Sequence, residues 1–113
     1  MSIEVIRTFE DPFYTMSTTL DGSDFLFEFR YNQREDAWYF DVALTDGTVL
    51  VRGVKVICNK PLLQRFADSR LPKGTLIAWP NTNTRKAPGL LELGEDKRVT
   101  LLYFSLSEGR PRR

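Results

Sequence analysis

The chain has 113 residues, enough for one domain with a single hydrophobic core. Its composition, 42% hydrophobic and 12% aromatic, is that of a globular protein and excludes a disordered one. The 16 basic and 15 acidic side chains nearly cancel, so the charge of the whole chain favours neither a nucleic acid nor an anionic membrane as partner.

The chain lacks residues on which several kinds of chemistry usually depend. The chain has no histidine, which removes the commonest general base and metal ligand. Its one cysteine, Cys58, follows an apolar run, and we expect a buried, unreactive thiol. No apolar segment is long enough to span a membrane, and no secretion signal is visible. We therefore expect the chain to fold in a reducing cytoplasm.

The first segments in chain order are two short stretches with partial alternation. Residues 2–9 predict either a first strand or an extended arm that adds a strand to a neighbouring sheet. Pro12 interrupts this segment because proline lacks a backbone donor. Residues 13–20 predict a strand with Tyr14, Met16 and Leu20 facing inward, and Asp21-Gly22 predicts a tight turn after it.

Residues 24–54 carry the strongest signal in the chain. Aromatic and β-branched side chains alternate with polar ones along residues 25–31 and 38–44, a period of two that is typical of strands with one buried face. A polar gap at 33–36 and the pair Asp46-Gly47 predict hairpin connections. The pattern therefore predicts a three-stranded antiparallel meander. We assign five large side chains of the chain to the core: Phe27, Phe29, Trp38, Phe40 and Tyr103.

The second half of the chain predicts fewer regular elements. Gly53 within a strand predicts a bulge or sharp bend. Pro61 and the apolar positions after it predict one short helix over 60–67. Residues 75–79 predict a strand, and residues 99–106 predict a last strand that is central or covered on both sides, because both of its faces are partly apolar.

These elements predict an all-β fold, a small antiparallel barrel or closed sandwich of six to seven strands with one short helix. We expect one domain over 1–113, with an N-terminal arm at 1–12, a long surface loop at 80–98 and a basic C-terminal tail at 107–113. Within the loop, we expect Leu90, Leu91 and Leu93 to pack back against the body.

The sequence motifs do not indicate a catalytic, cofactor or metal site. No glycine-rich phosphate loop is present, and the carboxylates lack ligand spacing. Glu28 and Asp41 could be neighbours across two strands, and an exposed pairing of these carboxylates with Arg30 or Arg52 explains them better than an acid/base dyad does. We expect no enzyme activity, cofactor, metal or membrane partner. The alternative that stays open is an OB-like module that binds single-stranded nucleic acid, although the aromatics alternate as a core does.

Short motifs occur in a fixed order along most of the chain. They are Leu20-Asp21-Gly22, Tyr31-Asn32, Trp38-Tyr39-Phe40-Asp41-Val42, Asp46-Gly47-Thr48, Val51-Arg52-Gly53-Val54-Lys55-Val56, Pro61-Leu62-Leu63, Leu71-Pro72-Lys73-Gly74-Thr75-Leu76, Leu93-Gly94 and Val99-Thr100-Leu101-Leu102-Tyr103. This ordered series resembles one known family, the baseplate plug proteins of tailed bacteriophages, typified by the plug of a cyanophage with a contractile tail. The similarity covers about residues 13–105 and excludes the two ends of the chain.

The resemblance implies a virion structural protein of the tail baseplate, assembled in the cytoplasm of the bacterial host. It implies a place near the end of the tail tube and the central hub, where the protein helps to close the channel, with hub, tail-tube and spike proteins as partners. It implies no active site. We expect several copies around the tail axis. We expect contacts from the arm by strand addition, and from the loop and the tail arginines by pairing with carboxylates, through Ile3, Val5, Ile6, Asn81, Asn83, Arg85, Lys86, Arg110, Arg112 and Arg113.

Overall fold

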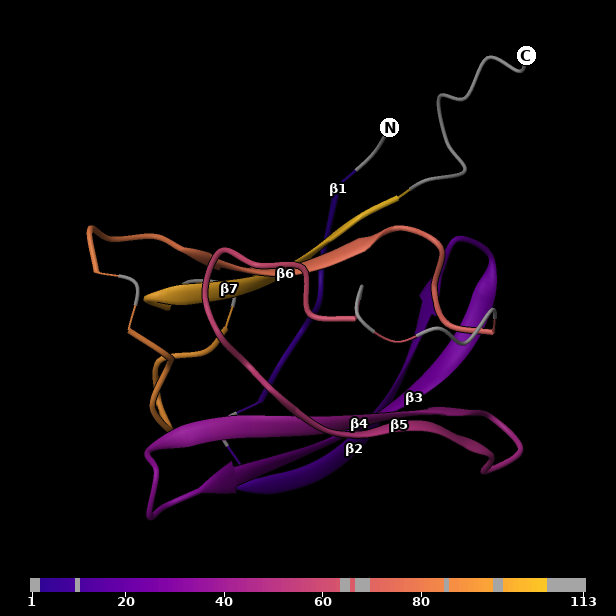
Figure 1. Cartoon of the computed structure of the whole chain (residues 1–113), viewed down its shortest axis with the longest axis horizontal. Helices are drawn as coiled ribbons and strands as arrows, with labels where there is room; N and C mark the ends of the chain where they lie inside the picture. The colour runs from indigo at the N-terminus through magenta and orange to yellow at the C-terminus, as the bar shows by residue number, and fades with distance from the viewer. Residues whose placement is uncertain are drawn as a thin grey trace.

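The computed structural model describes residues 3–9, 11–63, 66, 70–84, 86–94 and 97–105, and within these residues the fold is all-β. Two antiparallel sheets form two layers, one above the other in Figure 1. Seven strands make up these sheets: β1 (Ile3–Val5), β2 (Phe13–Leu20), β3 (Ser23–Asn32), β4 (Ala37–Leu44), β5 (Val49–Lys55), β6 (Thr75–Pro80) and β7 (Val99–Phe104).

The four-stranded sheet has the order β2-β3-β4-β5 and contains the predicted meander with β2 added at its edge. Asp21 and Gly22 join β2 to β3 with positive φ angles of 54° and 81°, as the tight turn between two strands requires. Between β4 and β5 the register shifts, and Gly53 has a φ of 68° in the left-handed region that favours glycine. The predicted bulge at Gly53 is confirmed.

The three-stranded sheet has the order β1-β7-β6, so the last strand lies between the first and the sixth. The prediction of a central last strand is confirmed. The two sheets are not joined by strand pairing into a closed barrel, and the fold is an open pair of layers. The all-β class and the strand number were predicted correctly, whereas closure of the sheets is not found.

The predicted helix over 60–67 is wrong for the part of that segment that the structure describes. Pro61 instead forms an antiparallel bridge with Ile77 of β6, and the Leu62 amide donates a hydrogen bond to the Leu76 carbonyl at 2.8 Å. Leu62 and Leu63 are still buried, as a helix face would have been. The side chains reach the core along the edge of β6, because tertiary pairing overrides local helix propensity. Gln64, Arg65 and Ala67 lie outside the described residues.

The core between the layers is built from the alternating aromatic positions. The five predicted core residues, Phe27, Phe29, Trp38, Phe40 and Tyr103, are all fully buried. Phe29 and Phe40 lie opposite each other in the β3–β4 register, with ring centroids 5.5 Å apart. The prediction that alternating positions form one buried face is therefore confirmed, since every second side chain of the meander enters the interior.

Two buried aromatic side chains also tie loops to the core. The indole Nε1 of Trp38 donates to the Gly89 carbonyl at 3.0 Å. The Tyr103 hydroxyl donates to the Asp21 carboxylate and accepts a hydrogen bond from the Gly74 amide at 2.6 Å. Gly74 is required at this close approach, because a Cβ there would lie 2.2 Å from the Phe104 carbonyl oxygen.

Replacement of Trp38 by alanine should destabilise the protein by about 3–5 kcal/mol, since it leaves a cavity in the core and removes the indole hydrogen bond to the Gly89 carbonyl. The matched control is Trp79→Ala, because Trp79 is 45% exposed and its loss should cost less than about 1 kcal/mol. Urea unfolding at constant m-value measures both changes. Equal shifts of the unfolding midpoint in the two variants would contradict the assignment of Trp38 to the core.

Candidate interaction surface

The first strand places two apolar side chains on the outside of the three-stranded sheet. Ile3 and Val5 pair with Phe104 and Leu102 of β7, and side chains of paired residues point to the same face. Ile3 is 57% exposed and Val5 is 46% exposed. Ile6 lies beyond the strand and is buried in the core, where its amide donates to the Leu101 carbonyl at 2.8 Å. Of the three predicted arm contacts, Ile3 and Val5 are therefore accessible and Ile6 is not.

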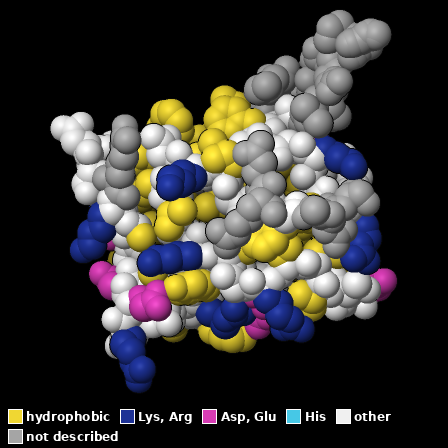
Figure 2. Space-filling model, viewed as in Figure 1, with side chains coloured by type: hydrophobic (Ala, Val, Ile, Leu, Met, Phe, Trp, Pro, Cys, Tyr) yellow, Lys and Arg dark blue, Asp and Glu magenta, His cyan; other side chains and the backbone are white. Residues whose placement is uncertain are grey.

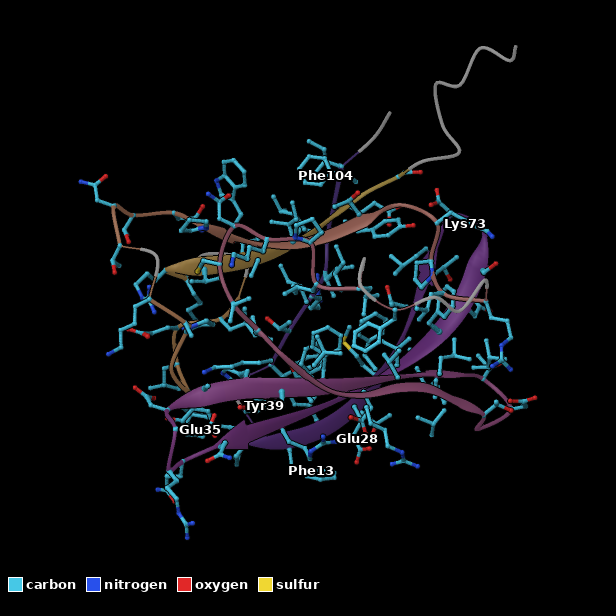
Figure 3. All side chains as sticks on the ribbon, in the orientation of Figure 1. Phe13, Glu28, Glu35, Tyr39, Lys73 and Phe104 are labelled. Atoms are coloured by element: carbon cyan, nitrogen blue, oxygen red, sulfur yellow. The ribbon has the colours of Figure 1, made fainter. Side chains whose placement is uncertain are left out.

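The central strand β7 is apolar on both faces. Leu101 and Tyr103 point into the core and are fully buried. Leu102 and Phe104 point to the opposite face and are half-buried. In Figure 3, Phe104 lies on the side of its sheet that faces away from the four-stranded sheet. Packing in the core therefore accounts for the apolar side chains on the inner face of β7. It does not account for those on the outer face.

The strand β6 extends the same surface. Ile77 pairs with Leu102, and Trp79, 45% exposed, pairs with Thr100. We call the resulting surface the outer apolar face, and it consists of Ile3, Val5, Ile77, Trp79, Leu102 and Phe104. Hydrophobic side chains are visible along this side of the molecule in Figure 2.

The outer apolar face has no chemistry other than packing. Its six side chains carry no titratable group, so it gains free energy mainly by removing apolar area from water, at about 25 cal/mol per Å². Exposed apolar patches on soluble proteins commonly mark contacts with other proteins. The sequence analysis named Ile3 and Val5 as contact residues but did not name the other four. The apolar character of both faces of residues 99–106 was a signal for Leu102 and Phe104, whereas Ile77 and Trp79 had no comparable signal.

The predicted loop contacts divide into structural and exposed residues. The Asn81 side chain donates to the Lys97 carbonyl at 2.9 Å and to Thr100 Oγ1 at 2.7 Å, so it holds the loop in place. The side chains of Asn83 and Lys86 are exposed and available for contacts. Arg85 and the tail residues Arg110, Arg112 and Arg113 lie outside the described residues.

Arg98 organises the loop between β6 and β7, and sequence reasoning did not identify it. Its guanidinium donates to the carbonyls of Lys86 and Ala87, both at 2.9 Å, and to Glu92 Oε1 at 2.9 Å. Leu93 is buried and Leu90 packs against the core, as expected, but Leu91 is 58% exposed and its predicted packing is wrong. The loop is therefore fastened to the body while it presents Leu91 outward.

Glu28 and Asp41 lie directly opposite each other on the outer side of the four-stranded sheet. Arg30 binds Asp41 through two hydrogen bonds of 2.9 and 3.0 Å, the Gly53 amide donates to Asp41 at 2.8 Å, and Arg52 lies 4.0 Å away. The predicted pairing of these carboxylates with Arg30 or Arg52 is confirmed, but the expectation of an exposed pair is wrong for Asp41, which is buried. Burial alone would raise the pKa of Asp41, but these hydrogen bonds and the two arginine charges hold it below its ordinary value of 3.8.

Three further features concern the cysteine, metal binding and membrane-spanning helices. Cys58 is buried, and burial raises the pKa of its thiol, which disfavours the reactive thiolate. Within the described ranges, no three Cys, Asp or Glu side chains gather in a way that could hold a metal ion. The same part of the chain contains no helix with the length and hydropathy to cross a membrane.

One comparison with known proteins gives a match. A family model with the description "Cyanophage baseplate Pam3 plug gp18" matches residues 3–107 of the 113-residue chain. The matched span includes all seven strands and the outer apolar face. A search of curated proteins gave no match.

Replacement of Asp41 by asparagine should lower the free energy of unfolding at pH 7 by about 1–3 kcal/mol, because hydrogen bonds to a charged group are lost from a buried site. The folded-state pKa of Asp41 is depressed. The wild-type protein should therefore keep this stabilisation above about pH 4 and lose it as the pH falls through the folded-state pKa, so the two proteins converge in acid. Denaturant titrations between pH 7 and pH 2 measure the difference.

The control for this experiment is Glu28→Gln. Glu28 lies 3.8 Å from Arg30 and its side chain is 37% exposed, so this ion pair contributes little to stability. A Glu28→Gln variant that loses as much stability as Asp41→Asn would show that the buried pair is not what stabilises this face.

Proposed function

Because the chain belongs to the cyanophage baseplate plug family, we propose that it closes the tail channel at the junction of the central hub and the tail tube. Family membership makes it a structural component of a phage tail baseplate, located in the virion tail and in contact with other baseplate proteins. The proposal adds the position on the tail axis, the closing of the channel, and the hub, tube and spike proteins as the specific neighbours.

The outer apolar face is the observation that supports packing against such a neighbour. Ile3, Val5 and Trp79 each leave about half of their surface exposed although they lie on one sheet face. A baseplate component is surrounded by other proteins, so this face would be covered in the assembled tail. The contact would be stable for the same reason as a protein core, since association removes apolar surface from water.

Charged residues of the loop and tail would add specificity to this contact. The side chain of Lys86 is exposed within the loop that Arg98 holds in place. Lys86 and the basic residues of the C-terminal tail would pair with carboxylates of a neighbouring subunit. Several copies arranged around the tail axis would each present the same surfaces, which is the simplest way for a small domain to close a wide channel.

The aromatic residues of the meander give no support to nucleic-acid binding as a second function. The rings of Phe27, Phe29 and Phe40, which could have formed a stacking platform, are fully buried. Single-strand binding needs such rings on an accessible surface beside basic side chains. We therefore keep one proposed function.

The proposed contact is tested by the variants Val5→Asp and Trp79→Asp, introduced into the phage. Each places a charge on the outer apolar face, where its desolvation would oppose association. We expect at least about a tenfold loss of the protein from purified virions, measured by quantitative mass spectrometry, with the isolated variants still folded. The control is Thr45→Asp at an exposed position in the turn between β4 and β5, which should be incorporated as the wild type is.

The position on the tail axis is tested by electron cryomicroscopy of intact virions. We expect density for the β domain inside the baseplate, across the channel below the tail tube. Virions assembled without the protein should have an open channel and release their DNA earlier on warming. Density for the domain at the outer rim of the baseplate, or unchanged DNA retention in its absence, would refute the plug proposal while leaving the family assignment intact.

A further inference from the structure

The edges of the two sheets differ in how well they are protected against pairing with another strand. Four of the seven described strands lie at an edge, namely β1, β2, β5 and β6. Strand β1 has only three residues, and the edge of β6 is covered by bridges from Cys58 and Pro61. Strand β5 is bulged at Gly53 and carries Arg52 and Lys55. Short length, cover, bulges and charge are the usual devices that stop edge-to-edge association.

Strand β2 has none of these devices. It pairs with β3 over eight consecutive residues without a register shift. Its sequence, Phe13–Leu20, contains no charged residue, no proline and no glycine, and most of its residues are β-branched or aromatic. Within the described part of the chain, no other strand pairs with its free side. A long, regular and uncharged edge is a template for strand addition.

The register identifies which backbone groups of β2 are open. The Tyr31 amide donates to the Pro12 carbonyl at 2.8 Å, so residue 12 directs its hydrogen-bonding groups toward β3. In an antiparallel pair the direction alternates along the strand. The even-numbered residues of β2 therefore bond to β3. The amides and carbonyls of four residues point to the free edge: Phe13, Thr15, Ser17 and Thr19.

We propose that this edge pairs with β2 of a second copy of the chain, in antiparallel orientation, to form a continuous eight-stranded sheet across a two-fold axis. When Phe13 pairs with Thr19 of the second copy and Thr15 with its Ser17, every open amide and carbonyl of the four residues gains a partner. Odd-numbered residues then face odd-numbered residues, so the inner and outer sides of both sheets stay aligned.

Two features of β2 favour a second copy as the occupant. In this register the two-fold axis lies at Met16, so Thr15, Met16 and Ser17 come close to their own equivalents in the second copy. A charge at these positions would be repelled by its equivalent, and β2 has no charge. The inward side chains Tyr14, Met16 and Thr18 are only half-buried. They need a neighbouring strand with apolar residues on its inner side and small polar residues on its outer side. Strand β2 has this alternation itself from Tyr14 onward, with Thr15, Ser17 and Thr19 facing outward. Phe13, which is 59% exposed, is the one apolar residue on its outer side.

The sharpest test is Ser17→Pro, because it removes an open donor without touching the β2–β3 ladder. Proline is tolerated at edge positions whose amide faces away from the sheet. In sedimentation velocity over a concentration series, the wild-type protein should form a dimer. Ser17→Pro should weaken the dimer by at least about tenfold, since both copies lose a hydrogen bond and the two rings obstruct the approach of the strands. Ser17→Ala keeps the backbone donor and should dimerise as the wild type does.

Two further variants make the result decisive. If Ser17→Pro does not fold, as judged by circular dichroism, Ser17→Lys replaces it, because two lysines near the axis repel each other. Trp79→Asp alters the outer apolar face and should leave the dimer intact. A wild-type protein that stays monomeric at its highest soluble concentration would overturn the proposal. So would a dimer that is insensitive at Ser17 or lost with Trp79→Asp. The isolated protein is used throughout, so the outcome is independent of the proposed place in the channel.

Discussion

The structure depends on one requirement, the burial of large aromatic rings between two sheets that are not closed into a barrel. Phe27, Phe29 and Phe40 come from adjacent strands and pack with centroids 5.5 to 6.0 Å apart. Trp38 and Tyr103 extend this cluster toward the loops and the three-stranded sheet. Because a domain of this size has little stability to spare, the rings on every second position account for much of its folding free energy.

Buried rings with polar atoms also determine where the irregular segments lie. A buried indole or phenol needs a hydrogen-bond partner, since an unpaired polar group in the core is costly. Trp38 finds its partner in the Gly89 carbonyl and Tyr103 in Asp21, so one ring fixes the loop before β7 and the other fixes the turn after β2. The aromatic core thus positions residues far from it in the sequence, including the segments that flank the outer apolar face.

Sequence reasoning succeeded where the signal is local. The strands of the meander, their buried faces, the turn at Asp21-Gly22 and the bulge at Gly53 follow from alternation and turn chemistry over a few residues. It failed where the structure depends on distant partners. Pro61 has helix-start character but pairs with Ile77, and no local pattern reveals that pairing. The outer apolar face was found only in part, because it arises when β1 and β6 come to lie on either side of β7.

The two sheets leave the molecule with chemically different outer sides, and this difference limits how it can be oriented in an assembly. On the four-stranded sheet, Asp41 and Arg30 form a bidentate pair beside Glu28 and Arg52. Covering this face with protein would remove charges from water, which costs more than it returns unless every charge is matched. The outer apolar face has no such cost. The three-stranded sheet is therefore the side that favours burial against another protein. The charged cluster of the four-stranded sheet favours water, although Phe13 at the edge of that sheet is 59% exposed.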